Sequence, residues 1–319
     1  MKIYLPEENY EENYNTLAAP YLEAHRQADD YFESFDGRKL HYAVYTADEA
    51  KGTLTIVHGF TESIIKFLPM TFVFLNEGYN VCLLDQRGHG RSFRYVENKS
   101  LTHIEKFEEY VKDLQTFIEK IVSALPGPHF LFSHSMGGGV AAELLETGTE
   151  FFKKAVLSSP MIEPAHAGVP LPVTKLVFGG MVLAGKKQST LFNKPDYNGE
   201  ETFEDSCATS RARFDWYHKR RAADPYLYNY NPSVGWAKES MKVPSVILKK
   251  GAPEAIKVPI LLFSCDNDTL VMRPAQETFI RRVKKGLFVA VANAKHEIYR
   301  STDDVLYPYL EQILDFFAR

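Results

Sequence analysis

The chain alternates between short, almost continuous apolar runs and longer segments in which apolar residues recur every three or four positions. Six such runs occur, at residues 54–58, 79–84, 129–133, 155–159, 259–264 and 287–292. Runs that are apolar on both faces are typical of strands covered by helices on each side. The pattern therefore predicts an α/β fold with a mostly parallel central sheet.

Other segments predict the elements around that sheet. YFESF and KLHYAVYT alternate apolar and polar residues on either side of Asp36-Gly37, which predicts an antiparallel hairpin. Helical spacing extends over 104–125, where Thr102 and Glu105 are placed as a capping box, and again from residue 304 to the C-terminus. Helices that alternate with strands in this way are expected on both faces of the sheet.

The alternation stops between residues 161 and 255, where prolines, glycines, aromatic and basic residues dominate. We predict that residues 1–160 and 256–319 form the core domain and that 161–255 is an inserted lid above the carboxyl edge of the sheet, where ligands of α/β proteins bind. Within it, the apolar run 173–185 is shorter than the roughly 18 residues that span a bilayer. It fits a helix packed over a pocket, or a helix resting on a lipid surface.

Composition excludes several classes of function. The 319 residues are 45% hydrophobic, and 37 basic against 41 acidic residues leave a formal charge of −4, so there is no global basic field for nucleic acid. Cys82, Cys207 and Cys265 are widely separated in the sequence, without the spacing of a metal-binding motif, and three cysteines do not make an even set of disulfide partners. The first residues contain no apolar stretch typical of a signal peptide. We expect no metal, no cofactor, no nucleic-acid partner and a cytoplasmic location.

Residues 133–137, SHSMG, predict a strand, a sharp turn and a helix with Ser135 at the apex, where a serine can act as a nucleophile. His296 follows the last apolar run, at the carboxyl end of a strand, and is the strongest candidate for the base. Asp266 and Asp268 both follow the preceding strand; Asp268 has the longer reach, whereas Asp266 could cap the turn. The order Ser135, Asp268, His296 is the order of α/β-hydrolases.

Amide donors for an oxyanion are expected close to the serine. One is the backbone N–H of Met136, directly after Ser135. The other is that of Phe60 in the His58-Gly59-Phe60 loop, because a glycine allows close approach of the backbone.

Four motifs carry a resemblance to a known family: VHGFTES, DQRGHGRS (85–92), SHSMGG and KHEI. Together they resemble the α/β-hydrolase superfamily, in the branch that contains bacterial lysophospholipases and monoacylglycerol lipases. The resemblance implies an α/β-hydrolase fold, an oxyanion hole at Phe60 and Met136, and Asp268 as the acid, with Cys265 in place of a family glycine. Ser133 likewise replaces the first glycine of the serine motif. In that family the 85–92 loop is structural, which implies that Asp85 and Arg87 hold neighbouring loops together.

These residues predict a serine hydrolase that cleaves carboxylic esters of lipids, lysophospholipids or monoacylglycerols, through an acyl-enzyme. The same triad fits an acyltransferase or a short-chain carboxylesterase, and a non-catalytic ligand-binding homologue is a further alternative. In the lid, basic and aromatic side chains fit either a headgroup site or a solvated helix face, and the candidate substrate-binding residues are Arg211, Arg213, Trp216, Arg220 and Arg221. The sequence is also compatible with transient contact with a membrane surface.

Overall fold

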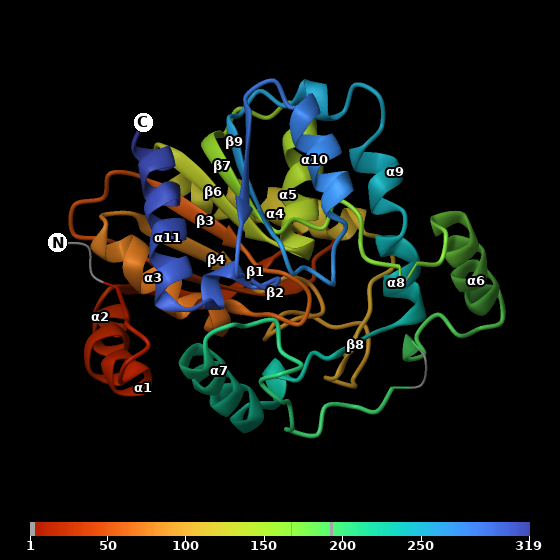
Figure 1. The fold of residues 1–319 in the computed structure, drawn as a ribbon, viewed down its shortest axis with the longest axis horizontal. Helices are drawn as coiled ribbons and strands as arrows, with labels where there is room; N and C mark the ends of the chain where they lie inside the picture. Colours follow the sequence, from red (N-terminus) through yellow and green to blue (C-terminus); the bar gives the residue numbers. More distant parts are fainter. Residues whose placement is uncertain (1–3, 167, 192–193) are drawn as a thin grey trace.

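An eight-stranded sheet forms the centre of the computed structural model, which describes residues 4–166, 168–191 and 194–319 (Figure 1). Its strand order is β1-β2-β4-β3-β6-β7-β9-β10. The strands are β1 (Arg26–Glu33), β2 (Lys39–Tyr45), β3 (Thr53–Val57), β4 (Asn80–Leu84), β6 (His129–His134), β7 (Phe152–Ser158), β9 (Ile260–Cys265) and β10 (Gly286–Val291). Within this sheet β2 is antiparallel to both of its neighbours, β1 and β4, and the other neighbouring strands are parallel to one another. The predicted hairpin and the six predicted strands are confirmed.

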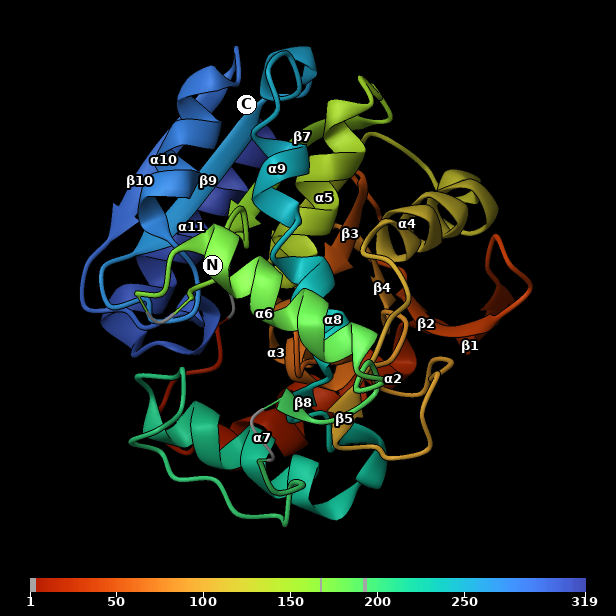
Figure 2. The same cartoon turned by 90° about the vertical axis from the view of Figure 1, so that its right-hand side faces the viewer.

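Two helical layers cover the sheet, as Figures 1 and 2 show. The core helices are α3 (Ile64–Asn76), α4 (Glu108–Lys120), α5 (Met136–Glu146), α10 (Arg273–Arg282) and α11 (Asp303–Ala318). Side chains of α4, α5 and α10 share one apolar core, and those of α3 and α11 share the other. Successive strand residues point to opposite cores: Leu131 faces the first, whereas Phe130 and Phe132 face the second. The α/β fold class with helices on both faces is therefore confirmed.

The predicted start of the helix after Thr102 is wrong. Leu101–Thr102 forms β5, a short strand that pairs with β8 (Asn231–Pro232) of the insertion, and α4 begins only at residue 108. The Glu105 side chain does not cap the helix, because its carboxylate bonds to Lys187 and lies 3.2 Å from the Nε2 of His103. A strand pairing and an ion pair with distant residues thus replace the local capping box.

The described part of segment 161–255 contains the α-helices α6 (Leu171–Leu183), α7 (Arg211–Ala223), α8 (Val234–Ser240) and α9 (Val243–Ile247). Figure 1 shows α7 below the sheet and α6 beside α8 at the right-hand side, while Val243 and Ile247 of α9 belong to the core shared with α5. The division into core and lid stays a prediction. Within the described ranges, no helix combines the length and the apolar character needed to cross a bilayer.

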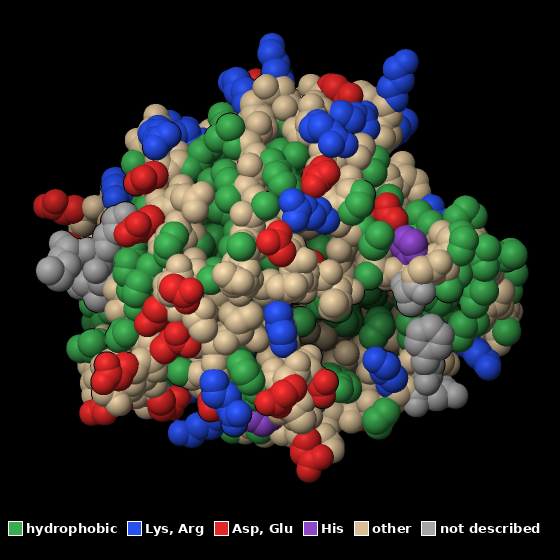
Figure 3. All heavy atoms as spheres, viewed as in Figure 1, with side chains coloured by type: hydrophobic (Ala, Val, Ile, Leu, Met, Phe, Trp, Pro, Cys, Tyr) green, Lys and Arg blue, Asp and Glu red, His purple; other side chains and the backbone are tan. Residues whose placement is uncertain are grey.

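Helix α6 turns most of its apolar side chains outward. Only Thr174 and Phe178 are buried, whereas Leu176 is 77% and Leu183 91% exposed. They form a green patch at the right-hand edge of Figure 3. The helix therefore does not simply seal a pocket, since one side of it has no partner in the described chain.

The N-terminal segment packs against the insertion. It contains α1 (Tyr10–Asn13), a π-helical segment (Tyr14–Ala18) and α2 (Ala19–Ala24). Trp216 of α7 makes edge-to-face contacts with Tyr10 and Tyr14, at centroid distances of 6.3 and 4.6 Å. This contact attaches α7 to one end of the chain.

Candidate active site

Ser135 stands at the sharp turn between β6 and α5. Its backbone has φ 53° and ψ −121°, a conformation that costs an L-residue energy and is kept only where the surroundings enforce it. A Cβ on Gly137 would lie 2.4 Å from two backbone carbonyl oxygens, so only glycine lets the start of α5 approach β3 this closely. Ser133 fits where the motif usually has glycine, because its small side chain is buried beside the carbonyl oxygen of Val156.

The structure brings Ser135, His296 and Asp268 together from three loops at the carboxyl ends of β6, β10 and β9. The Nε2 of His296 lies 2.8 Å from the Oγ of Ser135, and its Nδ1 lies 2.7 Å from the Oδ2 of Asp268. Ser135 is 8% exposed. A serine bonded to an imidazole that is bonded in turn to a carboxylate can transfer a proton away from its hydroxyl.

Asp268 is held in one orientation by its surroundings. Its Oδ1 accepts hydrogen bonds from the amides of Leu270 (2.9 Å) and Val271 (3.2 Å), which leaves Oδ2 to face the imidazole. Burial alone would raise the pKa of Asp268, but the hydrogen bond from His296 and the two amides hold it below the usual value. The competing Asp266 instead bonds to Arg273 at 2.9 Å.

The His58-Gly59-Phe60 loop lies against the serine. A Cβ on Gly59 would stand 2.8 Å from the Cβ of Ser135. The Phe60 ring packs against Trp236 of α8 at a centroid distance of 4.2 Å, which links the loop to the insertion. Donation to an oxyanion by the amides of Phe60 and Met136 stays a prediction.

Four of the five residues predicted to bind a headgroup instead attach α7 to other parts of the chain, and Arg211 pairs within the helix. Arg213 donates to the carbonyl oxygens of Ser301 (2.8 Å) and Leu5 (2.9 Å), and Trp216 packs on the N-terminal segment. The other three arginines have partners too: Arg211 bonds to Asp215, Arg220 to Glu11, and Arg221 to Glu201 and the carbonyl oxygen of Leu227.

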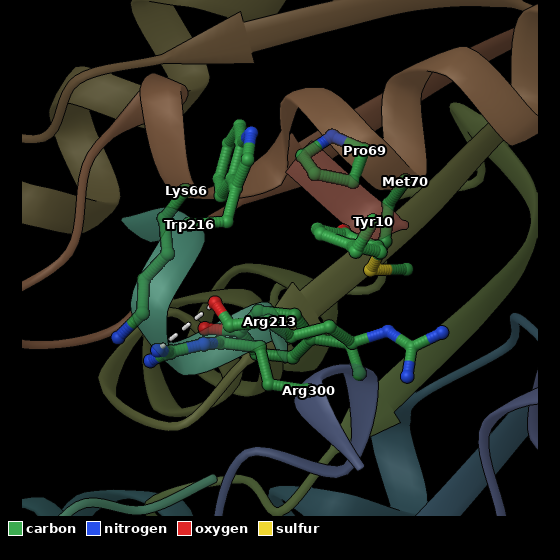
Figure 4. Close-up of a pocket in the computed structure, with 8 residues that line it drawn as sticks. Tyr10, Lys66, Pro69, Met70, Arg213, Trp216 and Arg300 are labelled. Atoms are coloured by element: carbon green, nitrogen blue, oxygen red, sulfur yellow. Dashed lines mark hydrogen bonds between the residues drawn. The ribbon is translucent and has the colours of Figure 1, made fainter. Parts of the chain in front are cut away.

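None of these partners touches Ser135. Figure 4 shows the junction of α7 with α3, where Arg213 and Trp216 line a cavity of only about 10 Å³. That is the space of about one water molecule. The headgroup interpretation stays a prediction: the guanidinium groups of Arg213, Arg220 and Arg221 are engaged within the chain, whereas Arg211 pairs with Asp215 at the surface of α7.

Sequence reasoning missed a group of buried charges behind His296. Glu62, Lys66, His134, Glu297 and Arg300 are each no more than 7% exposed. The spacing of Glu62 and Lys66, opposite charges four residues apart, was the available local signal, although Glu62 lies just before α3 begins at residue 64. The contact of Lys66 with Glu297 could not be inferred from it. In the parts of the chain that the structure describes, no cluster of three or more His, Cys, Asp or Glu side chains is arranged to hold a metal ion.

Comparisons with known proteins identify the family of the chain. The family model described as serine aminopeptidase, S33 (Hydrolase_4) matches residues 48–303. The chain is 26% identical over 271 residues to a probable lysophospholipase L2 of Haemophilus influenzae, covering 82% of each protein. It is 25% identical to a monoacylglycerol lipase of Mycolicibacterium smegmatis, covering 79% of this chain and 83% of the relative. A solved monoglyceride lipase of Saccharomyces cerevisiae superposes with a TM-score of 0.71 at 20% identity, covering 91% of this chain and 93% of that one, which shows a shared fold.

Proposed function

Because the chain belongs to the S33 serine aminopeptidase family of α/β-hydrolases, we propose that it hydrolyses carboxylic esters of lipids, with lysophospholipids or monoacylglycerols as substrates. The observation that carries the proposal is the hydrogen-bonded chain from Ser135 through His296 to Asp268 at a strained turn. The names of the lysophospholipase and monoacylglycerol lipase relatives support the substrate class.

In the proposed mechanism the Oγ of Ser135 attacks the acyl carbonyl while the Nε2 of His296 takes its proton. Asp268 accepts the Nδ1–H of His296, keeps the ring in the correct tautomer and stabilises the imidazolium. The amides of Phe60 and Met136 donate to the oxyanion. His296 then protonates the departing alcohol, and water attacks the acyl-enzyme in the same way to release the fatty acid.

A fluorophosphonate probe and a substrate panel test this proposal. We expect labelling of the intact protein, no labelling of Ser135→Ala, and hydrolysis of long-chain monoacylglycerols or lysophospholipids in preference to p-nitrophenyl acetate and aminoacyl amides. Labelling that persists in the alanine variant would refute the assignment of the nucleophile. If most of the acyl groups were transferred to an added alcohol, the assigned activity would be acyl transfer and not hydrolysis.

We also propose that α6 contacts a lipid surface containing anionic phospholipid. Exposed leucines on this helix would enter the apolar boundary of the bilayer. Residues 164–195 contain four lysines and neither aspartate nor glutamate; Lys187 is paired with Glu105, and the other three give the segment the opposite charge to such a surface. A lipid ester would then reach the site from the membrane in which it resides.

Sedimentation with phosphatidylcholine vesicles, with and without phosphatidylglycerol, tests this contact. We expect binding that increases with phosphatidylglycerol and falls at least fivefold in the double variant Leu176→Ser/Leu183→Ser, since each exposed leucine contributes about 1 to 2 kcal/mol when buried. Leu287→Ser is the matched control, because Leu287 is 55% exposed on β10. Equal binding by both variants would contradict the proposal. Loss of a dimer rather than of vesicle binding would assign the patch to a second copy of the chain.

A further inference from the structure

Five ionisable side chains are buried directly behind the proposed base. Glu62 follows β3, Lys66 lies on α3, His134 ends β6, and Glu297 and Arg300 follow His296. Charged side chains are almost never buried this fully unless they are paired, because each loses its hydration. Burying these five side chains costs solvation free energy, and packing alone does not explain why they are buried.

His134 is held so that both of its ring nitrogens face oxygen acceptors. Its Nδ1 lies 3.0 Å from the Oε2 of Glu62, and its Nε2 lies 3.2 Å from the backbone oxygen of His296. A neutral imidazole carries only one N–H and would leave one acceptor facing a lone pair. With an ionised Glu62 carboxylate, the geometry favours the doubly protonated, cationic ring. Burial opposes that charge, but the Glu62 carboxylate outweighs burial and raises the pKa of His134.

The other four side chains form a connected set of ion pairs. Lys66 bonds to the Glu297 carboxylate and lies 3.4 Å from the Oε1 of Glu62, while the Nη1 of Arg300 lies 2.5 Å from the Oε2 of Glu297. Together with His134 the cluster holds three cations and two anions. Its net charge is therefore one positive charge.

The cluster joins the three parts of the chain that surround the site. The Gly59 amide, next to Phe60, donates to Glu62 at 2.5 Å. Glu297 immediately follows His296. The insertion is attached through Arg300, whose backbone oxygen accepts from the amide of Ser210 at 3.1 Å. Figure 4 shows Lys66 and Arg300 beside α7 at this junction.

We propose that this buried charge cluster is a positioning device for His296, and that its net charge sets the lower end of the pH range in which His296 acts as a base. The inference rests on the proposed function of His296. The rings of His134 and His296 are only 4.9 Å apart. Unit charges at such distances inside a protein shift proton affinities by about one unit or more.

Other ionisable groups face this region from each packed element. They are Asp268 after β9, Tyr299 after β10, and Cys207 and Tyr217 of the insertion. Burial, together with nearby carboxylates, raises the pKa of the Cys207 thiol to about 12 and that of the Tyr299 hydroxyl well above its usual value, so neither changes charge near neutral pH. The five cluster members and Asp268 therefore carry the charge that acts on His296.

Charge-removing variants with opposite signs test the proposal. Lys66→Met removes a cation, so the imidazolium of His296 forms more readily and the acid limb of kcat/KM moves up by about one pH unit. Glu297→Gln removes an anion, and the limb moves down by a similar amount. The double variant restores the net charge, so its acid limb is expected nearer to that of the wild type than the limb of either single variant. KM stays unchanged, because none of these groups needs to touch the substrate.

Two further measurements keep the test decisive. Lys257→Met and Glu150→Gln remove the members of an exposed ion pair and should leave the acid limb in place. His134→Gln removes a cation without emptying the Lys66 position and should move the limb up, which covers the case in which Lys66→Met does not fold. Circular dichroism confirms the fold of each variant.

Nitrogen NMR of the histidine rings separates failure of this inference from failure of the proposed function, since it needs no turnover. We expect His134 to carry protons on both ring nitrogens at pH 7, and the titration of His296 to move as described for each variant. Shifts of both single variants in the same direction, an unmoved titration, or a His134 ring with one bare nitrogen would overturn the inference. If the NMR titrations move as expected but no Ser135-dependent hydrolysis is found, the inference about the charge cluster stands and the proposed enzymatic function is refuted.

Discussion

Replacing Asp268 by asparagine should disable the proposed base while leaving the fold intact. The amide oxygen of the new side chain must stay where the Oδ1 of Asp268 accepts from Leu270 and Val271, because the alternative orientation would set its NH₂ group against two N–H donors. The NH₂ group then faces the Nδ1 of His296, at the position of an oxygen 2.7 Å away. To avoid a donor–donor contact, His296 has to carry its proton on Nε2.

That tautomer presents an N–H to Ser135 in place of a lone pair, so the imidazole cannot take the serine proton. We expect kcat to fall about 10³- to 10⁴-fold, as for the same change in serine proteases. This corresponds to about 4 to 5.5 kcal/mol of transition-state stabilisation. KM should change little, because Asp268 does not reach the substrate in the proposed mechanism.

Single-turnover kinetics with a monoacylglycerol at pH 7.5 measure this loss, and urea unfolding confirms that the variant is folded. Asp266→Asn is the matched control: Asp266 lies two residues away and bonds to the exposed Arg273, so its kcat should stay within twofold of the wild type. An Asp268→Asn variant that keeps more than a tenth of the wild-type kcat, or an Asp266→Asn variant with the larger loss, would refute this reasoning.

Three further predictions concern residues that support the site without touching the substrate. Arg87→Met should cost about 3 to 5 kcal/mol in urea unfolding, because it leaves the buried carboxylate of Asp113 without its cation, while kcat of the folded enzyme stays unchanged. Gly137→Ala should abolish probe labelling of the protein, because its Cβ would stand 2.4 Å from two carbonyl oxygens; labelling at the wild-type rate would show that the turn relaxes. Burial opposes ionisation of Asp85, but its hydrogen bond with His41 lowers its pKa from 3.8 to about 2. The ionised carboxylate therefore stabilises the folded protein fully above pH 4, and this stabilisation is lost as the pH falls through 2. Asp85→Asn should remove about 2 kcal/mol at pH 7 and much less at pH 2, as measured by urea unfolding at both pH values.

Local patterns allowed much of the core to be predicted. The apolar runs are short and almost continuous, and each identifies a strand from its own residues. Ser135, Asp268 and His296 were predicted together because the carboxyl ends of parallel strands meet at one edge of a sheet, so a residue that follows such a strand has only a small region to occupy.

Long-range pairing decided what local patterns could not. Glu105 was a plausible cap by spacing, but Lys187, 82 residues away, takes its carboxylate. The arginines of α7 resemble a free basic cluster in the sequence, but the fold places partners for Arg213 and Arg220 on the N-terminal segment and after β10.

The sequence by itself determined the strands, the hairpin and the three residues of the candidate site, because these depend on periodicity and on strand ends. Only the tertiary structure decided which charges are buried and what they pair with: Lys66 and Glu297 meet across 231 residues. The physical reason is that the charge state of a side chain depends on the dielectric and the partners around it, and those are assembled from distant segments only when the chain folds.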